Sequence, residues 1–72
     1  MIFEQVVDII TDYLDINPDE IKTDSTFEDL ELNSGDLLDL EMAIEDEFGV
    51  AVEINDGLKT VGDVVEYIEE NM

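Results

Sequence analysis

Apolar residues recur at the period of an α-helix in three stretches of this chain, and this pattern restricts the possible folds more than any other feature of the sequence. In the first stretch, residues 2–14, apolar side chains fall three or four positions apart, and acidic or polar residues occupy the positions between them. Such spacing places the apolar groups on one side of a helix. We predict a long amphipathic helix whose buried side carries Phe3, Val6, Val7, Ile10, Tyr13 and Leu14, widened by Ile2 and Ile9.

The second helical stretch is expected to begin after Asn33 and to end at Phe48. Asn is a residue that caps helix starts well, and Asp36, at the third helical position, places a carboxylate where the helix dipole favours negative charge. Gly49 is expected to close this helix in the left-handed conformation. Its buried side is predicted to carry Leu37, Leu40, Ile44 and Phe48, with Leu38 and Ala43 beside them.

A last helix is predicted after Thr60. Thr60 and Asp63 have the spacing of a capping box, in which each residue satisfies a backbone N–H near the other. The apolar stripe that follows consists of Val61, Val64, Val65, Ile68 and Met72.

The segments between these helices have weaker patterns. Asn17, Pro18 and Glu20 supply a cap, a proline at the first helical position and an acidic residue three positions past the cap, which favours one short helical turn. Residues 22–31 are polar and without helical period. We predict a long loop there, which Phe27 and Leu30 anchor to the core.

Residues 50–54 alternate like a β-strand, but a single strand without a partner does not make a sheet. We expect an extended connection that buries Val50, Val52 and Ile54, followed by a turn at residues 55–58. The chain is therefore predicted to be all-α. The expected architecture is a small four-helix bundle of three main helices and one short helix, with a long loop between the first and second main helices. It would form one domain over residues 1–72.

The charge of the chain selects its partners. It has 22 Asp and Glu residues against two Lys, which gives a formal charge of −20 at pH 7. Such a surface repels nucleic acid phosphates and anionic lipids, so we expect no nucleic acid partner and no membrane insertion, and instead partner proteins with basic patches. No segment has the pattern of a secretion signal or of a membrane span. We expect a cytoplasmic protein, with the monomer as its default state.

The composition argues against catalysis and against a dedicated metal site. Without His, Cys or Arg, the acid and base groups are carboxylates and two lysines. A chain of this size offers little room for the pocket that would desolvate a catalytic carboxylate. No register of the sequence fits a calcium-binding loop, which needs oxygen ligands, a central glycine and a final Glu at fixed positions. We predict a non-catalytic protein.

Ser34 is the residue of greatest chemical interest. Its hydroxyl is expected at the junction between the long loop and the second helix. Serine is also common at helix starts, so a purely structural role is the simpler interpretation of this residue on its own. The acidic residues that follow it are likewise most simply a solvated helix face.

The surroundings of Ser34 favour a function instead. The segment from Leu30 to Val50 resembles the acyl carrier protein family, in which an Asp-Ser-Leu motif precedes a helix of the pattern Asp-x-x-Glu-Leu-x-x-Ala-Leu-Glu-x-x-Phe-Gly. Residues 17–21 and 59–68 resemble the family's stretch after its first helix and its last helix. The helix pattern is matched without a gap by Asp36, Asp39, Leu40, Ala43, Ile44, Glu45, Phe48 and Gly49.

This resemblance implies that Ser34 carries 4′-phosphopantetheine as a covalent cofactor and that acyl intermediates are held on it as thioesters. It further implies service in fatty acid biosynthesis or in a specialised acyl or polyketide pathway. The implied partners are a phosphopantetheinyl transferase and acyl-processing enzymes with basic docking patches. The implied docking face on the second helix consists of Asp36, Leu38, Asp39, Met42, Glu45 and Asp46.

Three positions near Ser34 depart from the family pattern. Asn33 replaces the Asp before the serine, Gly35 replaces the Leu after it, and Glu31 stands where glycine is usual. A carrier-like fold that is not modified and acts only as an acidic interaction module is therefore a second hypothesis. A small acidic inhibitor that mimics a polyanion is a third. Aminoacyl, D-alanyl and peptidyl carriers share the same architecture, and no residue decides among their cargoes.

Overall fold

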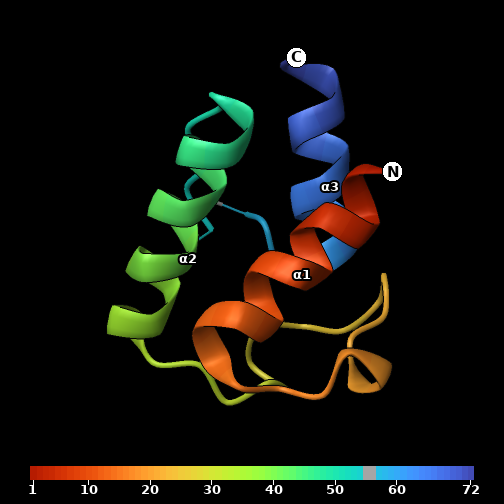
Figure 1. The fold of residues 1–72 in the computed structure, drawn as a ribbon, viewed down its shortest axis with the longest axis vertical. Helices are drawn as coiled ribbons and strands as arrows, with labels where there is room; N and C mark the ends of the chain where they lie inside the picture. Colours follow the sequence, from red (N-terminus) through yellow and green to blue (C-terminus); the bar gives the residue numbers. More distant parts are fainter. Residues whose placement is uncertain (55–56) are drawn as a thin grey trace.

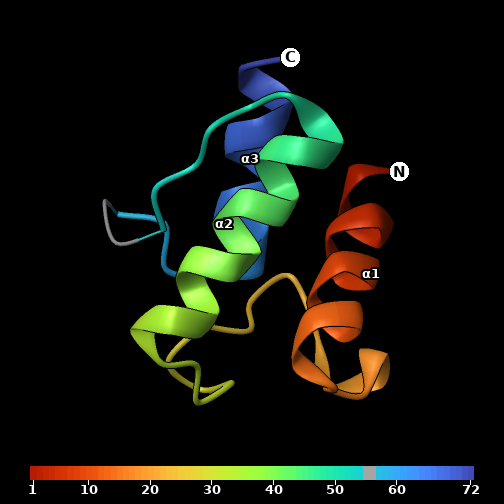
Figure 2. The ribbon, with the colours of Figure 1, turned by 60° about the vertical axis from the view of Figure 1, so that its left-hand side comes forward.

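The computed structural model describes residues 1–54 and 57–72. Its elements in chain order are helix α1 (Ile2–Leu14), the 3₁₀ turn η1 (Pro18–Glu20), helix α2 (Ser34–Phe48) and helix α3 (Val61–Glu70). Figure 1 shows that α1 runs in the opposite direction to α2 and α3, and α1 packs against both. Figure 2 shows the described residues between α2 and α3 on the side of the bundle away from α1.

The all-α prediction is confirmed, since the elements within the described residues are helices and one 3₁₀ turn. The bounds predicted for α1 and α2 agree with the structure, and the single short turn after Asn17 is also present. Gly49 ends α2 with a φ of 70°, the left-handed conformation expected of a glycine cap. The turn predicted at residues 55–58 falls partly on residues 55 and 56, which lie outside the described residues.

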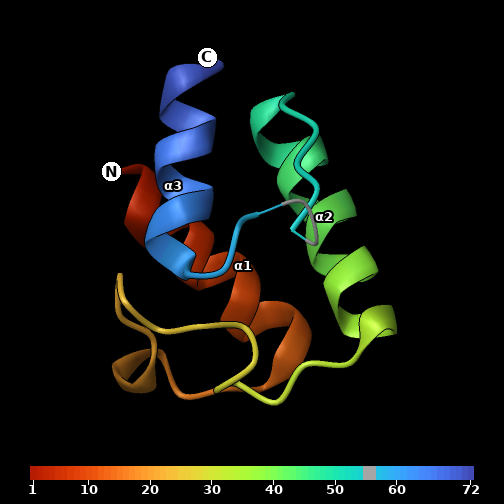
Figure 3. The same cartoon turned by 180° about the vertical axis from the view of Figure 1, so that it is seen from behind.

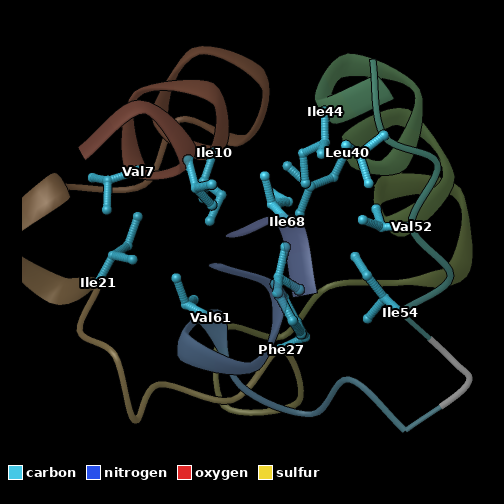
Figure 4. Packing of buried hydrophobic residues seen from close by; sticks show 13 residues of the cluster. Val7, Ile10, Ile21, Phe27, Leu40, Ile44, Val52, Ile54, Val61 and Ile68 are labelled. Carbon is cyan, nitrogen blue, oxygen red and sulfur yellow. The ribbon is translucent and has the colours of Figure 1, made fainter. Parts of the chain in front are cut away.

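One hydrophobic cluster joins the three helices and both irregular segments. Figure 4 shows side chains from all of these segments meeting between the helices. Of the two predicted loop anchors, Phe27 is buried at about 5% exposure, and Leu30 is partly buried and packs against the cluster. Ile54 from the connection is also about 5% exposed, as predicted. Burial of an aliphatic side chain contributes about 1.5–3 kcal/mol to stability, so the side chains that are fully buried contribute most to the core. The fully buried side chains are Val6, Ile10, Leu40, Ile44, Val61, Val64 and Ile68.

Three residues assigned to buried stripes lie in solvent instead. Tyr13 is 58% exposed in the last turn of α1, where its polar tip reaches water. Leu38 is 60% exposed because it precedes the buried Leu40 by two positions and so points to the other side of the helix. Met72 is 74% exposed because α3 ends at Glu70.

The long loop is fastened to the start of α3 by backbone hydrogen bonds. The N–H of Gly62 donates to the carbonyl of Thr23 at 2.8 Å, and the N–H of Val61 donates to that of Ser25 at 2.9 Å. Helix starts have N–H groups without intrahelical partners, and the loop carbonyls satisfy them here. The close approach requires a glycine, since a Cβ at Gly62 would lie 2.7 Å from the Thr23 oxygen. Figure 3 shows the loop beneath the start of α3.

The predicted capping box of α3 is also present. The Thr60 hydroxyl accepts from the Asp63 N–H at 3.0 Å. In return, one oxygen of Asp63 accepts from the Thr60 N–H at 3.2 Å and from the Lys59 N–H at 3.1 Å. These bonds, first that from Thr60 and then that from Lys59, lower the pKa of Asp63 because they favour its charged form.

Candidate functional site

Ser34 is exposed and is the first residue of α2. The residue that caps the helix is its neighbour Asn33, whose Oδ1 accepts from the Asp36 N–H at 2.8 Å. Asp36 completes a capping box by accepting from the Asn33 N–H at 3.4 Å. Asn33 therefore caps the helix, which is the structural role that Ser34 could otherwise have had. Ser34 is exposed to solvent in the first turn.

The start of a helix suits the attachment of a phosphate group. Backbone N–H groups of the first turn and the positive end of the helix dipole both favour negative charge there. This local effect matters in a chain with a formal charge of −20, because the rest of the surface repels a phosphate.

A tight turn immediately before the site explains one departure from the family pattern. Glu31 has a φ of 59°, in the left-handed region. Its N–H donates to the carbonyl of Glu28 at 3.0 Å, and the N–H of Leu32 donates to that of Phe27 at 3.4 Å. This pair of bonds is the Schellman arrangement, in which the left-handed position is usually glycine. The chain therefore places a side chain in a left-handed position that glycine would occupy without strain.

The six residues predicted to form a docking face lie along α2 beyond Ser34. Leu38 and Met42 are 60% and 65% exposed, one and two turns after the serine on the same side of the helix. Asp39, Glu45 and Asp46 are also exposed. Asp36 is half-buried, and its carboxylate serves the cap. The exposed side of α2 thus combines two large apolar side chains with three acidic groups.

A pocket of about 460 Å³ opens beside the same end of α2. Leu37, one turn after Ser34, forms part of its wall, and residues of the loop before α2 and of the connection before α3 form the rest. Sequence reasoning named none of its lining residues as such. Leu32, Leu37 and Leu58 are apolar in the sequence, but only the structure shows that they are half-buried. The full lining consists of Thr26, Phe27, Glu28, Leu32, Leu37, Ile54, Gly57, Leu58 and Lys59.

Comparison with known proteins identifies the family. Residues 4–68 match the family model described as "Phosphopantetheine attachment site". The acyl carrier protein of Streptococcus thermophilus (strain CNRZ 1066) is 42% identical over 69 residues, which cover 96% of this chain and 93% of the relative. The chain belongs to the acyl carrier protein family. The acyl carrier protein of Lactococcus lactis subsp. cremoris (strain MG1363) is 43% identical over 70 residues, covering 97% of this chain and 96% of the relative.

Membership of the acyl carrier protein family confirms the resemblance seen in the sequence. The protein is a non-catalytic acyl carrier with covalently attached 4′-phosphopantetheine. Its partners, as a class, are the transferases that attach this group and the enzymes that process the acyl cargo. In residues 1–54 and 57–72, every helix is too short or too polar to cross a membrane.

Proposed function

We propose that Ser34 is the attachment residue and that the chain serves fatty acid biosynthesis. The observation that supports this most strongly is an exposed serine in the first turn of a helix whose cap is supplied by its neighbour Asn33. The attached group supplies a thiol, which this chain lacks entirely, for holding acyl groups as thioesters. Attachment forms an Oγ–P bond to Ser34 and breaks the pyrophosphate P–O bond of coenzyme A, so that adenosine 3′,5′-bisphosphate leaves and the hydroxyl proton passes to a base of the transferase. The helix start favours the charge of the resulting phosphodiester.

The pocket beside Leu37 would receive the acyl chain. Its walls include five apolar side chains, and its edge lies one turn of helix from Ser34. An aliphatic chain gains about 0.8 kcal/mol for each methylene removed from water, which favours a folded-back position over one in solvent. The apolar wall residues are Phe27, Leu32, Leu37, Ile54 and Leu58.

The exposed side of α2 would dock partner enzymes. Leu38 and Met42 offer apolar contact, and Asp39, Glu45 and Asp46 attract basic patches. Asp36 would contribute its charge at the helix start while it holds the cap. Attraction between opposite charges speeds the encounter and weakens as salt screens it, which suits a carrier that must leave one enzyme for the next.

We further propose that the protein acts as a monomer in the cytoplasm, where coenzyme A is available as the donor of the attached group.

The test is in vitro loading of the full chain. We expect coenzyme A and a broad-specificity phosphopantetheinyl transferase to add the mass of one phosphopantetheine, measured on the intact protein. Ser34→Ala is expected to abolish the gain. Ser25→Ala is the matched control, because Ser25 is the other serine of the chain and lies in the long loop.

Two outcomes would contradict the proposal. A mass gain that persists in Ser34→Ala would move the attachment elsewhere. No gain in the parent chain, with this transferase and with that of the source organism, would favour the unmodified acidic module that Asn33 and Gly35 suggested.

A further inference from the structure

One carboxylate of α2 turns inward. The Oε2 atom of Glu41 accepts a hydrogen bond from the backbone N–H of Ile54 at 2.8 Å, and Glu41 is half-buried. Asp39 and Glu45, the nearest acidic residues on either side along α2, are exposed. Glu41 thus has a structural partner thirteen positions away in the chain.

The partner segment has little other support from regular structure. Residues 50–54 leave the end of α2 and run back beside that helix without belonging to a helix or a strand (Figure 3). Its side chains Val52 and Ile54 point into the core (Figure 4). The bond to Glu41 therefore fixes the far end of the segment to α2.

The same bond joins two walls of the pocket. Ile54, on the connection, and Leu37, on α2, both line it. Leu37 lies one turn before Glu41 on α2, on the same side of the helix. Movement of the Ile54 wall away from α2 consequently requires the Glu41 bond to break.

We propose that Glu41 is a positioning residue that sets how far the pocket can open, and thereby the length of apolar chain that it admits. We call the Glu41–Ile54 hydrogen bond the latch. Identifying that chain as acyl cargo rests on the proposed function, but the latch itself does not depend on Ser34. A bond to a charged acceptor is stronger than one between neutral groups, and breaking it leaves a backbone N–H without its partner.

The first measurement is amide hydrogen exchange by NMR on the unmodified protein. In Glu41→Ala we expect exchange at Ile54 to become about tenfold faster, because the bond that protects it is lost. Glu41→Gln retains an oxygen acceptor and is expected to stay near the parent rate. Glu45→Ala, which removes an exposed carboxylate one turn further along α2, is the matched control and should not change Ile54.

If Glu41→Ala does not fold, Glu41→Leu replaces it, since Leu keeps helix propensity and side-chain bulk but cannot accept a hydrogen bond. Unchanged exchange at Ile54 in a folded variant would overturn the latch. An equal effect of Glu45→Ala would do the same.

The second measurement tests the pocket. We would titrate the unmodified protein with neutral straight-chain alcohols from 1-hexanol to 1-dodecanol, and follow the methyl signals of Leu37 and Leu58. Neutral probes avoid repulsion by the acidic surface. The parent chain, Glu41→Gln and Glu45→Ala are expected to favour the same alcohol length, and Glu41→Ala a longer one.

The alcohol titration separates this proposal from the assignment of Ser34, because these probes need no attached arm. An unchanged length preference in Glu41→Ala would overturn the role of Glu41 in setting the opening, as would absence of binding to the parent chain. Failure of Ser34 to be loaded would overturn only the attachment site.

Discussion

Single residues around the site obey local rules, and these were the most predictable part of the chain. Asn33 and Asp36 form the expected cap because both partners lie within one turn of the same helix. Exposure of individual side chains was less predictable. Tyr13 fits the apolar stripe of α1, but its burial depends on what packs against that end of the helix, which the sequence of α1 does not contain.

Glu31 is expected to lower stability because of its left-handed backbone. An L-residue in that region has its Cβ too close to the following carbonyl, at a cost of about 1–2 kcal/mol, whereas glycine has no Cβ. Glu31→Gly should therefore raise the free energy of unfolding, by about 1 kcal/mol once the added chain entropy of glycine is subtracted. Urea denaturation followed by circular dichroism measures this.

Glu31→Ala is the control, because it removes the same charge and keeps the Cβ. Equal stabilisation by both variants would assign the effect to charge and contradict the role of the backbone.

Helices and loops were predictable wherever their signals are local, and the contacts between them were not. The bounds of α1 and α2 follow from apolar period and caps. The bonds from Thr23 and Ser25 to the start of α3, and the bond from Glu41 to Ile54, join residues far apart in sequence. Neither an apolar period nor a cap signal in the sequence specifies such pairs. The residues that line the pocket depend on these contacts, so they could not be predicted from the sequence.

Two glycines provide a matched test of the contacts between helices and loops. Gly35 and Gly62 each occupy the second position of a capped helix, yet their surroundings differ. A Cβ at Gly62 meets the backbone oxygen of Thr23 at 2.7 Å, while one at Gly35 meets the side-chain oxygen of Asn33 at 3.3 Å. Gly62→Ala should destabilise the protein by about 1–3 kcal/mol, because the loop must move.

Gly35→Ala should be less destabilising than Gly62→Ala, because alanine gains up to about 1 kcal/mol of helix propensity and the crowded atom is the side-chain Oδ1 of Asn33, whose small shift weakens the cap bond to Asp36 but moves no backbone. Thermal unfolding of both variants beside the parent measures the contrast. Equal effects of the two substitutions would contradict the structural difference between the sites.

At the scale of the whole molecule, electrostatic repulsion opposes the fold. The formal charge of −20 resides on a molecule whose extents are 27 × 24 × 20 Å, which is about two to three Debye lengths at 0.1 M salt. At that salt concentration each carboxylate repels mainly its near neighbours, whereas at about 10 mM salt, where the Debye length is about 30 Å, the repulsion extends across the molecule. The sequence makes this term predictable, since it depends on composition and size more than on geometry.

We expect the melting temperature to rise by several degrees when NaCl is increased from about 10 mM to 0.5 M, as the Debye length falls from about 30 Å to about 4 Å. Within residues 1–54 and 57–72, acidic groups do not gather into a cluster able to hold a metal ion. Magnesium and calcium at equal concentration should accordingly raise the melting temperature equally. Scanning calorimetry in each salt measures both effects, and an unchanged melting temperature or a marked preference for one cation would contradict them.

The position of the chain ends has a practical consequence. Both termini lie at the end of the bundle opposite the start of α2 (Figure 1), and Met1 and Met72 are 87% and 74% exposed. A linker joined to either end would leave the bundle on the far side from Ser34. The protein could therefore be immobilised on a bead or fused to a second domain with its serine facing the solution, where large enzymes can reach it.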